Sequence, residues 1–197
     1  MSSTTEKVIA LLKSNLSENR FKHSMNVADC AKELAIRFNC DENKAYLTGL
    51  LHDCSTKYNS DEMIALARKI RLKTTEEELK NPVSSLHAAL SAYIAERDYG
   101  VHDKEILQAI AYHSSGGINM TALDKIIGLA DAIEPSRTGS EIDNIRVIAK
   151  NDLNEAYFAK HIFYMINAIR NQIYLSDVKV NVYNYLVSEK EQKPTKP

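Results

Sequence analysis

The sequence is poor in cysteine, and its three cysteines form no recognised pairing or metal-binding pattern. Cys30, Cys40 and Cys54 are odd in number, and none of them lies in a Cys-x-x-Cys motif. This excludes a disulfide framework and a zinc ribbon as the basis of the fold. We therefore expect reduced thiols in the protein core, although Cys54, directly after Asp53, could make an activity sensitive to oxidation.

Long apolar segments and an excess of charge are also absent. No apolar stretch approaches the roughly 20 residues that span a bilayer, and Met1 to Lys7 lack the apolar run of a signal peptide. The chain has 25 basic and 26 acidic side chains and a formal net charge of −1. A general attraction to nucleic acid polymers or to anionic membranes is thereby excluded, so any recognition of phosphate must be local. We expect a cytoplasmic protein.

The alternation of polar and apolar residues that marks β-strands is missing, whereas apolar residues recur three and four positions apart along the chain. A chain of 197 residues with 44% apolar content is long enough for one domain with a sizeable core. We predict an all-α fold without internal repeats. It is expected to contain an N-terminal helix over residues 1–16, one main domain over 17–188 and a disordered tail over 189–197.

Start and stop signals divide the chain into a series of predicted helices. Asp41 and Asp103 can cap the starts of two of them, and Thr121 with Asp124 can form a capping box. Residues 73–81 are polar and are predicted to form a surface excursion. The predicted helices run over residues 5–16, from 18 to about 38, from 41 to 51, 60–70, 82 to about 100, 105–113, 121 to before Pro135, onward from 140, and 152–175.

Histidine and aspartate recur in these segments in the order His23, His52-Asp53, His87, His113 and Asp131. Taken singly, each is more often a surface or hydrogen-bonded core residue than a ligand. Together they supply the mixture of imidazole and carboxylate that suits iron, manganese or zinc. Asp53 and Asp131 also follow apolar neighbours, where an unpaired charge is costly to bury, so a positive group is expected to face each of them. The pattern therefore favours a metal site.

The other two histidines have a different setting. His102 lies in a polar connection between helices, and His161 follows Lys160 in the long C-terminal helix. Both are interpreted as surface residues.

Short motifs surround the candidate ligands. They are Arg20-Phe21-Lys22-His23-Ser24, Gly49-Leu50-Leu51-His52-Asp53, Leu86-His87, Ala111-Tyr112-His113-Ser114-Ser115-Gly116, and Leu129-Ala130-Asp131-Ala132-Ile133-Glu134-Pro135-Ser136-Arg137. Over about residues 20–175, the chain resembles the HD-domain metal phosphohydrolases and, among them, the YqeK family. The last motif is the most specific, because it goes well beyond the general HD pattern. The resemblance implies a single HD-domain helical bundle with a metal site in its core.

The resemblance also implies an activity, the symmetrical hydrolysis of diadenosine tetraphosphate to two ADP by a metal-activated water. It implies that His23, His52, Asp53 and Asp131 hold iron. Of the residues near the phosphates, Ser114 stands where the family commonly has threonine, and it keeps a hydroxyl group. The implied catalytic residues are Asp53, His87 and His113, and the implied substrate-binding residues are Arg20, Asp53, His87, His113, Ser114, Asp131 and Arg137.

Several assignments stay open at this level. Manganese or zinc could replace iron, and His87 with His113 could bind a second metal. Either of these two histidines could act as the general acid. Lys57 is a weaker candidate for phosphate contact, because a solvated loop lysine is at least as common.

The long C-terminal helix has two further possible roles. Near Asn171, Ile173 and Tyr174 it could supply a wall for adenine. Its apolar residues could instead pack in the core or form a homodimer contact; these residues are Phe158, Ile162, Phe163 and Ile166.

Two rival functions are compatible with the same order of ligands. One is a di-iron HD-type oxygenase, but Arg20 and Arg137 argue for a phosphate-rich substrate. The other is a catalytically silent nucleotide-binding sensor, but the complete ligand set argues against lost catalysis. A purely structural helical module would leave both the arginines and the two aspartates without a role.

Overall fold

The structure, a computed structural model, describes residues 3–191. Within this range it contains helices and no β-strand, which confirms the predicted all-α fold. The helices are α1 Ser3–Asn15, α2 Glu18–Arg37, α3 Glu42–Leu51, the 3-10 helix η1 Cys54–Lys57, α4 Ser60–Lys69, α5 Glu76–Lys80, α6 Pro82–Ser85, α7 His87–Tyr99, α8 Lys104–Tyr112, α9 Ala122–Ile133, α10 Ser140–Ile148, α11 Leu153–Arg170 and α12 Asp177–Glu191.

The predicted helix starts at Asp41, Asp103 and Thr121 are confirmed. The carboxylates of Asp41 and Asp103 accept hydrogen bonds from the first backbone N–H groups of α3 and α8. Thr121 and Asp124 form the expected capping box of α9. The predicted excursion at 73–81 contains the short helix α5, and a break at Leu86 divides the predicted helix 82–100 into α6 and α7.

The C-terminal part of the chain differs most from the prediction. Helix α11 ends at Arg170 instead of 175, since Gln172 has a left-handed backbone conformation with φ of 55° that terminates the helix. Helix α12, Asp177–Glu191, was not predicted from the sequence. Residues 189–191 of the expected disordered tail belong to α12, and 192–197 lie outside the described residues.

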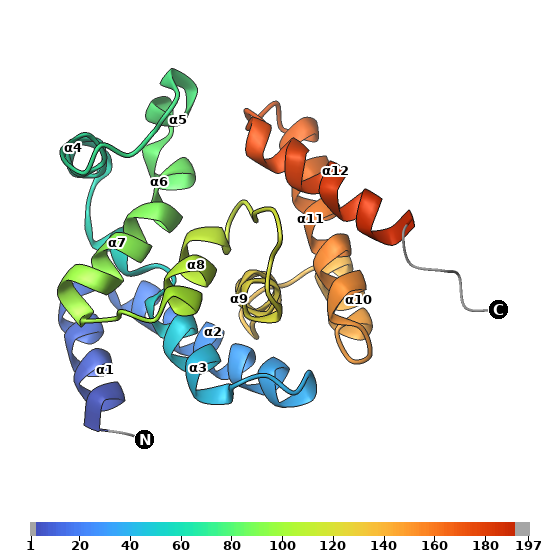
Figure 1. The fold of residues 1–197 in the computed structure, drawn as a ribbon, viewed down its shortest axis with the longest axis horizontal. Helices are drawn as coiled ribbons and strands as arrows, with labels where there is room; N and C mark the ends of the chain where they lie inside the picture. Colours follow the sequence, from blue (N-terminus) through green and yellow to red (C-terminus); the bar gives the residue numbers. More distant parts are fainter. Residues whose placement is uncertain (1–2, 192–197) are drawn as a thin grey trace.

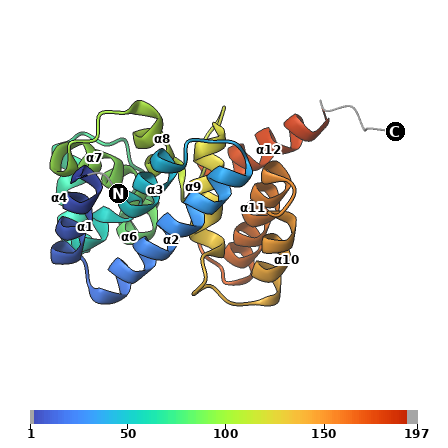
Figure 2. The same cartoon turned by 90° about the horizontal axis from the view of Figure 1, so that it is seen from below.

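Helix α9 is the central helix of the fold. Residues 123–130 of this helix are all buried, and Ile126, Ile127, Leu129 and Ala130 have no exposed surface. Figure 2 shows α9 between the group formed by α2, α3 and α8 and the group formed by α10 and α11. A functional residue on α9 is therefore surrounded by several other helices.

Close packing of α2 and α3 brings two candidate ligand motifs together. A Cβ atom on Gly49 of α3 would lie 2.7 Å from Cα of Ala28 in α2, closer than real Cβ contacts. Glycine at this position therefore permits the helix contact. It places His52, at the end of α3, beside His23 of α2.

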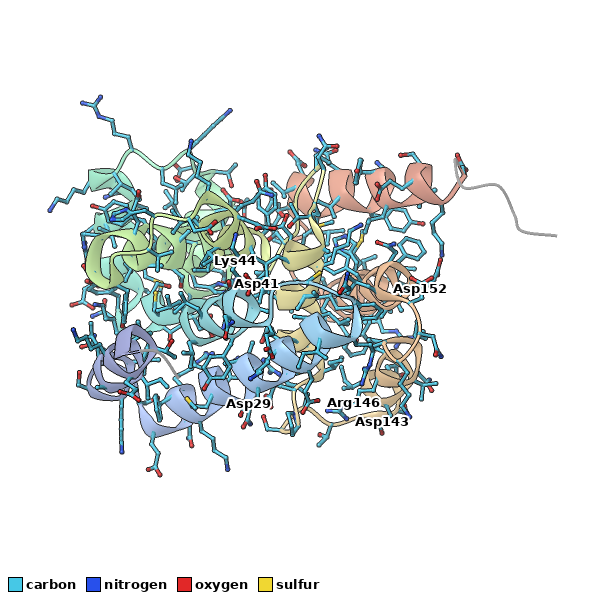
Figure 3. All side chains as sticks on the ribbon, turned by 60° about the horizontal axis from the view of Figure 1, so that its bottom comes forward. Asp29, Asp41, Lys44, Asp143, Arg146 and Asp152 are labelled. Carbon is cyan, nitrogen blue, oxygen red and sulfur yellow. The ribbon has the colours of Figure 1, made fainter. Side chains whose placement is uncertain are left out.

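Arg146 of α10 fixes the turn that follows α9. Its guanidinium group donates to the carbonyl oxygens of Ile133 and Glu134 at 2.9 Å and of Arg137 at 2.7 Å, and it pairs with Asp143. These carbonyls lie at or beyond the end of α9, where helices leave acceptors unsatisfied. Figure 3 shows Arg146 and Asp143 together on this part of the molecule. The turn that carries Arg137 is thus held from outside the pocket.

Lys44 of α3 ties this helix to α8. Its Nζ lies 2.8 Å from Oδ2 of Asp103 and 3.0 Å from Oε2 of Glu105. The two tied helices end at His52 and His113, respectively. Within residues 3–191, no helix combines the length and the apolar character needed to cross a membrane.

The three cysteines are free thiols at or near the core. Cys54 is fully buried, whereas Cys30 and Cys40 are partly buried against the main core. Burial raises the pKa of the Cys54 thiol to about 12. Because the thiolate is the reactive form, the structure argues against the predicted sensitivity of Cys54 to oxidation.

Candidate metal centre and phosphate pocket

Five helices bring the predicted His and Asp residues to one point. The residues come from α2 (His23), the end of α3 (His52 and Asp53), the start of α7 (His87), the end of α8 (His113) and α9 (Asp131). The ring centroids of His23 and His52 are 5.1 Å apart, those of His52 and His113 are 4.9 Å apart, and those of His87 and His113 are 5.0 Å apart. The histidines and aspartates that are spread along the sequence therefore form one cluster in space, which we call the His/Asp centre.

Two of these histidines are oriented by their own helices. Nδ1 of His52 donates to the carbonyl oxygen of Gly49, and Nδ1 of His113 donates to that of Ile110, both at 2.8 Å. A neutral imidazole that donates through Nδ1 carries its lone pair on Nε2. Both Nε2 atoms therefore face the centre as potential metal ligands, an orientation that metal-binding histidines commonly receive from a neighbouring acceptor.

The donor set fits a divalent cation. His23, His52 and Asp131 form one group of potential ligands and His52, Asp53 and His113 form a second, and within each group the ligand atoms lie within 4.8 Å of one another. Nε2 of His23 lies 3.1 Å from Oδ1 of Asp131. Nevertheless, Nε2 of His23 and Nε2 of His52 are buried and have no hydrogen-bond partner. Buried nitrogen atoms without partners are costly, and a shared cation would satisfy both.

The structure brings the four predicted metal ligands together, and it adds His113 to the second group. The resemblance implied phosphate contact and a catalytic role for His113, and a second metal at His87 and His113 was left open. Nε2 of His113 lies 3.9 Å from Oδ1 of Asp53 and 3.1 Å from Nε2 of His87. This position is compatible with either role.

Glu134 supports the centre from behind and was not predicted as a site residue. It is fully buried. Its carboxylate lies 3.1 Å from Nδ1 of His23 and accepts from Nδ2 of Asn26 at 3.0 Å and from the N–H and hydroxyl groups of Ser136. A carboxylate on the second nitrogen of a histidine orients the ring and favours metal binding. Its position in the Glu-Pro motif after Asp131 was the available sequence signal.

Each carboxylate of the centre is paired with an arginine. Nη1 of Arg20 lies 2.9 Å from Oδ2 of Asp53, and Nη2 of Arg137 lies 2.9 Å from Oδ1 of Asp131. The prediction that a positive group faces each aspartate is confirmed.

Both aspartates are ionised despite their burial. Burial alone would raise the pKa of Asp53, but the adjacent His52, His87 and His113 lower it to about 2. Burial opposes ionisation of Asp131 as well, and the adjacent imidazole of His23 and the charges around the carboxyl hold its pKa well below the usual range. The centre is therefore ready to bind a cation near neutral pH.

A pocket of about 570 Å³ opens over the centre. It lies between α5 and α6 on one side and α11 and α12 on the other, which face each other across the upper part of Figure 1. Its lining contains five cationic side chains and two carboxylates, those of the centre; the cations are Arg20, Lys80, Arg137, Lys160 and Lys179. The predicted residues His87, His113 and Ser114 line it too. Such a pocket attracts a polyanion.

Three sequence interpretations are wrong in this region. Lys57 does not line the pocket but pairs with Asp98 at 3.0 Å. Asn171, Ile173 and Tyr174 follow the end of α11, are exposed, and supply no wall to the pocket. His161, interpreted as a surface residue, is 4% exposed because α12 covers it. His102 is exposed, as predicted.

Several pocket residues were missed in the sequence, among them three from the last two helices. Lys160 and Tyr164 lie one turn apart on α11, and Lys179 lies on α12. No motif accompanied them, since lysine and tyrosine occur on many helix surfaces. Only the packing of α11 and α12 turns them towards the pocket.

The fold and the His/Asp centre together define an α-helical, metal-dependent phosphohydrolase of the HD type. The family model described as "HD domain" matches residues 20–136, more than half of the chain. The chain therefore belongs to the HD family, and its domain is one that binds a divalent metal. Within that family it belongs to the YqeK group of symmetrical bis(5'-nucleosyl)-tetraphosphatases, as its similarity to individual relatives shows.

A protein of Bacillus subtilis (strain 168) named "Bis(5'-nucleosyl)-tetraphosphatase, symmetrical" is 36% identical over 184 residues, which cover 93% of this chain and 97% of the relative. A protein of Halalkalibacterium halodurans with the same name is 35% identical over 191 residues, covering 94% and 98%. A crystal structure from Clostridium acetobutylicum, described as a predicted HD superfamily hydrolase involved in NAD metabolism, has a TM-score of 0.89 at 34% identity and covers 96% of this chain and 99% of that one.

Proposed function

We propose that this protein hydrolyses diadenosine tetraphosphate symmetrically and releases two molecules of ADP. The observation that carries the proposal is the His/Asp centre in the lining of a cationic pocket, with an arginine on each of its carboxylates. The names of the relatives from Bacillus subtilis and Halalkalibacterium halodurans support the same reaction. A substrate with a chain of four phosphates suits the excess of cations in the pocket.

We assign His23, His52, Asp53 and Asp131 to one divalent metal, which we propose to be iron. Manganese and zinc accept the same ligand types and are the alternatives. When bound, the metal supplies a Lewis acid that lowers the pKa of water towards neutrality, so that water can attack phosphorus. The group formed by His52, Asp53 and His113 supports a second ion as an alternative to direct phosphate contact by His113.

Arg20 and Arg137 would bind the phosphates on the two sides of the cleaved bond. Each guanidinium group already lies 2.9 Å from a carboxylate of the centre, so both are within reach of a phosphate there. The planar guanidinium group can donate two hydrogen bonds to phosphate oxygens. Because the substrate has two equal halves, one arginine on each side is compatible with cleavage in the middle.

His87 is the candidate for a hydrogen-bond donor to the leaving phosphate. Nδ1 of His113 donates to the carbonyl oxygen of Ile110, so Nε2 of this neutral ring can only accept a hydrogen bond. Nε2 of His87 lies 3.1 Å from Nε2 of His113 and must therefore be the donor of that contact. Burial lowers the pKa of both rings, and that of His113 falls to about 3. Both rings are thus neutral near pH 7. When a metal or a phosphate replaces the contact between the two rings, the Nε2–H group of His87 is free to hold the leaving oxygen, with the Ser114 hydroxyl nearby in the pocket lining.

Two further properties stay predictions. A cytoplasmic location is expected from the sequence. A homodimer is compatible with a groove between α10 and α11 that is lined by Ile162, Phe163 and Ile166.

The experiment that tests the proposed function is anaerobic incubation of the iron-loaded protein with diadenosine tetraphosphate, followed by chromatographic separation of the products. We expect ADP as the sole nucleotide product. Full turnover without oxygen would also exclude the rival oxygenase. Release of AMP and ATP would contradict symmetrical cleavage, and tight substrate binding without any product would favour the rival sensor.

A further inference from the structure

One side of the pocket is formed by α11 and α12. Its pocket-lining residues are Lys160 and Tyr164 of α11 and Lys179 of α12, and we call them the α11–α12 wall. The ring of Tyr164 lies close enough to Asp131 and Arg137 for both charges to affect its pKa, which burial raises. The wall therefore adjoins the half of the centre that contains Asp131.

Lys160 is a buried cation without an acidic partner. It is 4% exposed, and it forms no ion pair with any residue of the described range 3–191. Its Nζ donates to the carbonyl oxygen of His113 at 3.2 Å and lies 5.2 Å and 5.6 Å from the ring centroids of Tyr157 and Tyr164. An ammonium group has three donors, so this single hydrogen bond leaves further donors for a ligand.

The space around Lys160 is built by close packing of α9 and α11. A Cβ atom on Gly128 of α9 would lie 2.9 Å from the carbonyl oxygen of His113 and 3.5 Å from Nζ of Lys160. Glycine at position 128 leaves room for the lysine and its acceptor. The ammonium group thus has a defined position beside the centre.

Lys179 provides a second cation on the same side. It is half-buried and also lacks an ion pair among residues 3–191. Its backbone carbonyl accepts a hydrogen bond of 2.9 Å from Nε2 of the buried His161. Lys160 and Lys179 line the same pocket, and burial lowers the pKa of both.

The other pocket cations differ, because each already has a carboxylate partner. Arg20 pairs with Asp53, Arg137 with Asp131 and Lys80 with Glu77. Two neighbouring, partly desolvated ammonium groups without counter-ions are unfavourable unless an anion binds between them. The anion that the pocket is proposed to receive is a chain of phosphates.

We propose that Lys160 and Lys179 form a phosphate subsite that binds one nucleoside diphosphate half of the substrate, and that His161 positions Lys179. The half concerned is the one on the side of Asp131 and Arg137. This inference rests on the proposed function, because it assigns the place of one product of that reaction. A purely structural role for Lys160, as a donor to the end of α8, is the alternative that the test must separate.

The test compares Lys160→Met and Lys179→Met with Lys57→Met, which removes the same charge from a lysine outside the pocket. Binding of ADP and of inorganic pyrophosphate to the metal-loaded proteins is measured by calorimetry, together with metal content and with KM and kcat for diadenosine tetraphosphate. We expect both pocket variants to bind ADP and pyrophosphate about 10- to 100-fold more weakly, as for a lost hydrogen bond to a charged group. KM should rise while metal content is unchanged, and Lys57→Met should behave as the wild type.

Wild-type affinity for ADP and pyrophosphate in both pocket variants would overturn the inference. If Lys160→Met does not fold, Lys179→Met decides, since Lys179 is only half-buried and lies on the last helix. The two proposals can fail separately. A wild-type protein that does not cleave diadenosine tetraphosphate contradicts the proposed function, whereas the binding of ADP and pyrophosphate still decides on the subsite.

Discussion

The His/Asp centre and the α11–α12 wall face the same pocket, but different contacts hold their side chains. His52 and His113 are each oriented by a carbonyl group three residues earlier in the chain. Lys160 is held by the carbonyl group of His113, 47 positions away, and the backbone of Lys179 by His161, 18 positions away. Local contacts leave a short motif in the sequence, whereas contacts between distant segments leave none.

The two regions also differ in charge balance. Both carboxylates of the centre have arginine partners, and its remaining unsatisfied atoms are nitrogen lone pairs suited to a cation. The lysines of the wall have no acidic partners among residues 3–191, so their unsatisfied charge suits an anion. The pocket thus offers complementary sites to a metal and to the phosphates of a substrate.

The largest effect is expected from a change in the centre. Asp53→Ala removes one of the two carboxylates of the His/Asp centre, so bound metal should be lost and turnover should fall to background. Metal content by elemental analysis and ADP release measure this. The control is Asp98→Ala, which removes a carboxylate that pairs with Lys57 outside the pocket. Full activity of Asp53→Ala would show that the site is assigned wrongly.

A smaller effect should follow from a change one step behind the ligands. Glu134→Gln keeps the shape of the side chain but weakens the acceptor that orients His23. We expect metal affinity to fall by about 10- to 100-fold, as for other partners of metal-binding histidines. Titration with a metal chelator measures the affinity, and the exposed Glu141→Gln is the matched control. An unchanged affinity would limit the role of Glu134 to folding.

The smallest effect on catalysis is expected at His161, which lies behind the wall. His161→Phe removes the hydrogen bond to Lys179 and should raise KM by about 2- to 10-fold, without loss of metal, as for a typical lost hydrogen bond. A raised KM with unchanged metal content would show that the α11–α12 wall contributes to substrate binding and not to metal binding.

The same variant has a distinctive effect on stability as a function of pH. Burial lowers the pKa of His161 to about 4, below the value of about 6.5 in an unfolded chain. Between these values the unfolded state binds more protons, so wild-type stability should fall as the pH decreases from 6.5 to 4. In His161→Phe this slope should be smaller by up to about 1.4 kcal/mol per pH unit. Urea unfolding at several pH values measures it, and the exposed His102→Phe should keep the wild-type slope.

The helices and the centre were largely predictable, and the reasons are visible in particular residues. Asp41, Asp103 and Thr121 are caps that act on the backbone of their own helices, so local sequence was sufficient to place them. Helix α12 was missed because its stability comes from Val182 and Leu186, which pack against Tyr157 and Met120. Contacts with residues so distant in the chain do not appear in a local pattern.

The helical class, the order of the histidine and aspartate ligands and the two arginines that accompany them can be read from the amino-acid sequence alone, because spacing, capping and motif act over a few residues. That the ligand atoms meet, that Glu134 lies behind His23, and that Lys160 and Lys179 face the pocket follows from the folded arrangement of the helices. These facts depend on how α9, α11 and α12 pack. Burial and distance across helices, which control charge pairing and pKa, arise only when the helices are assembled.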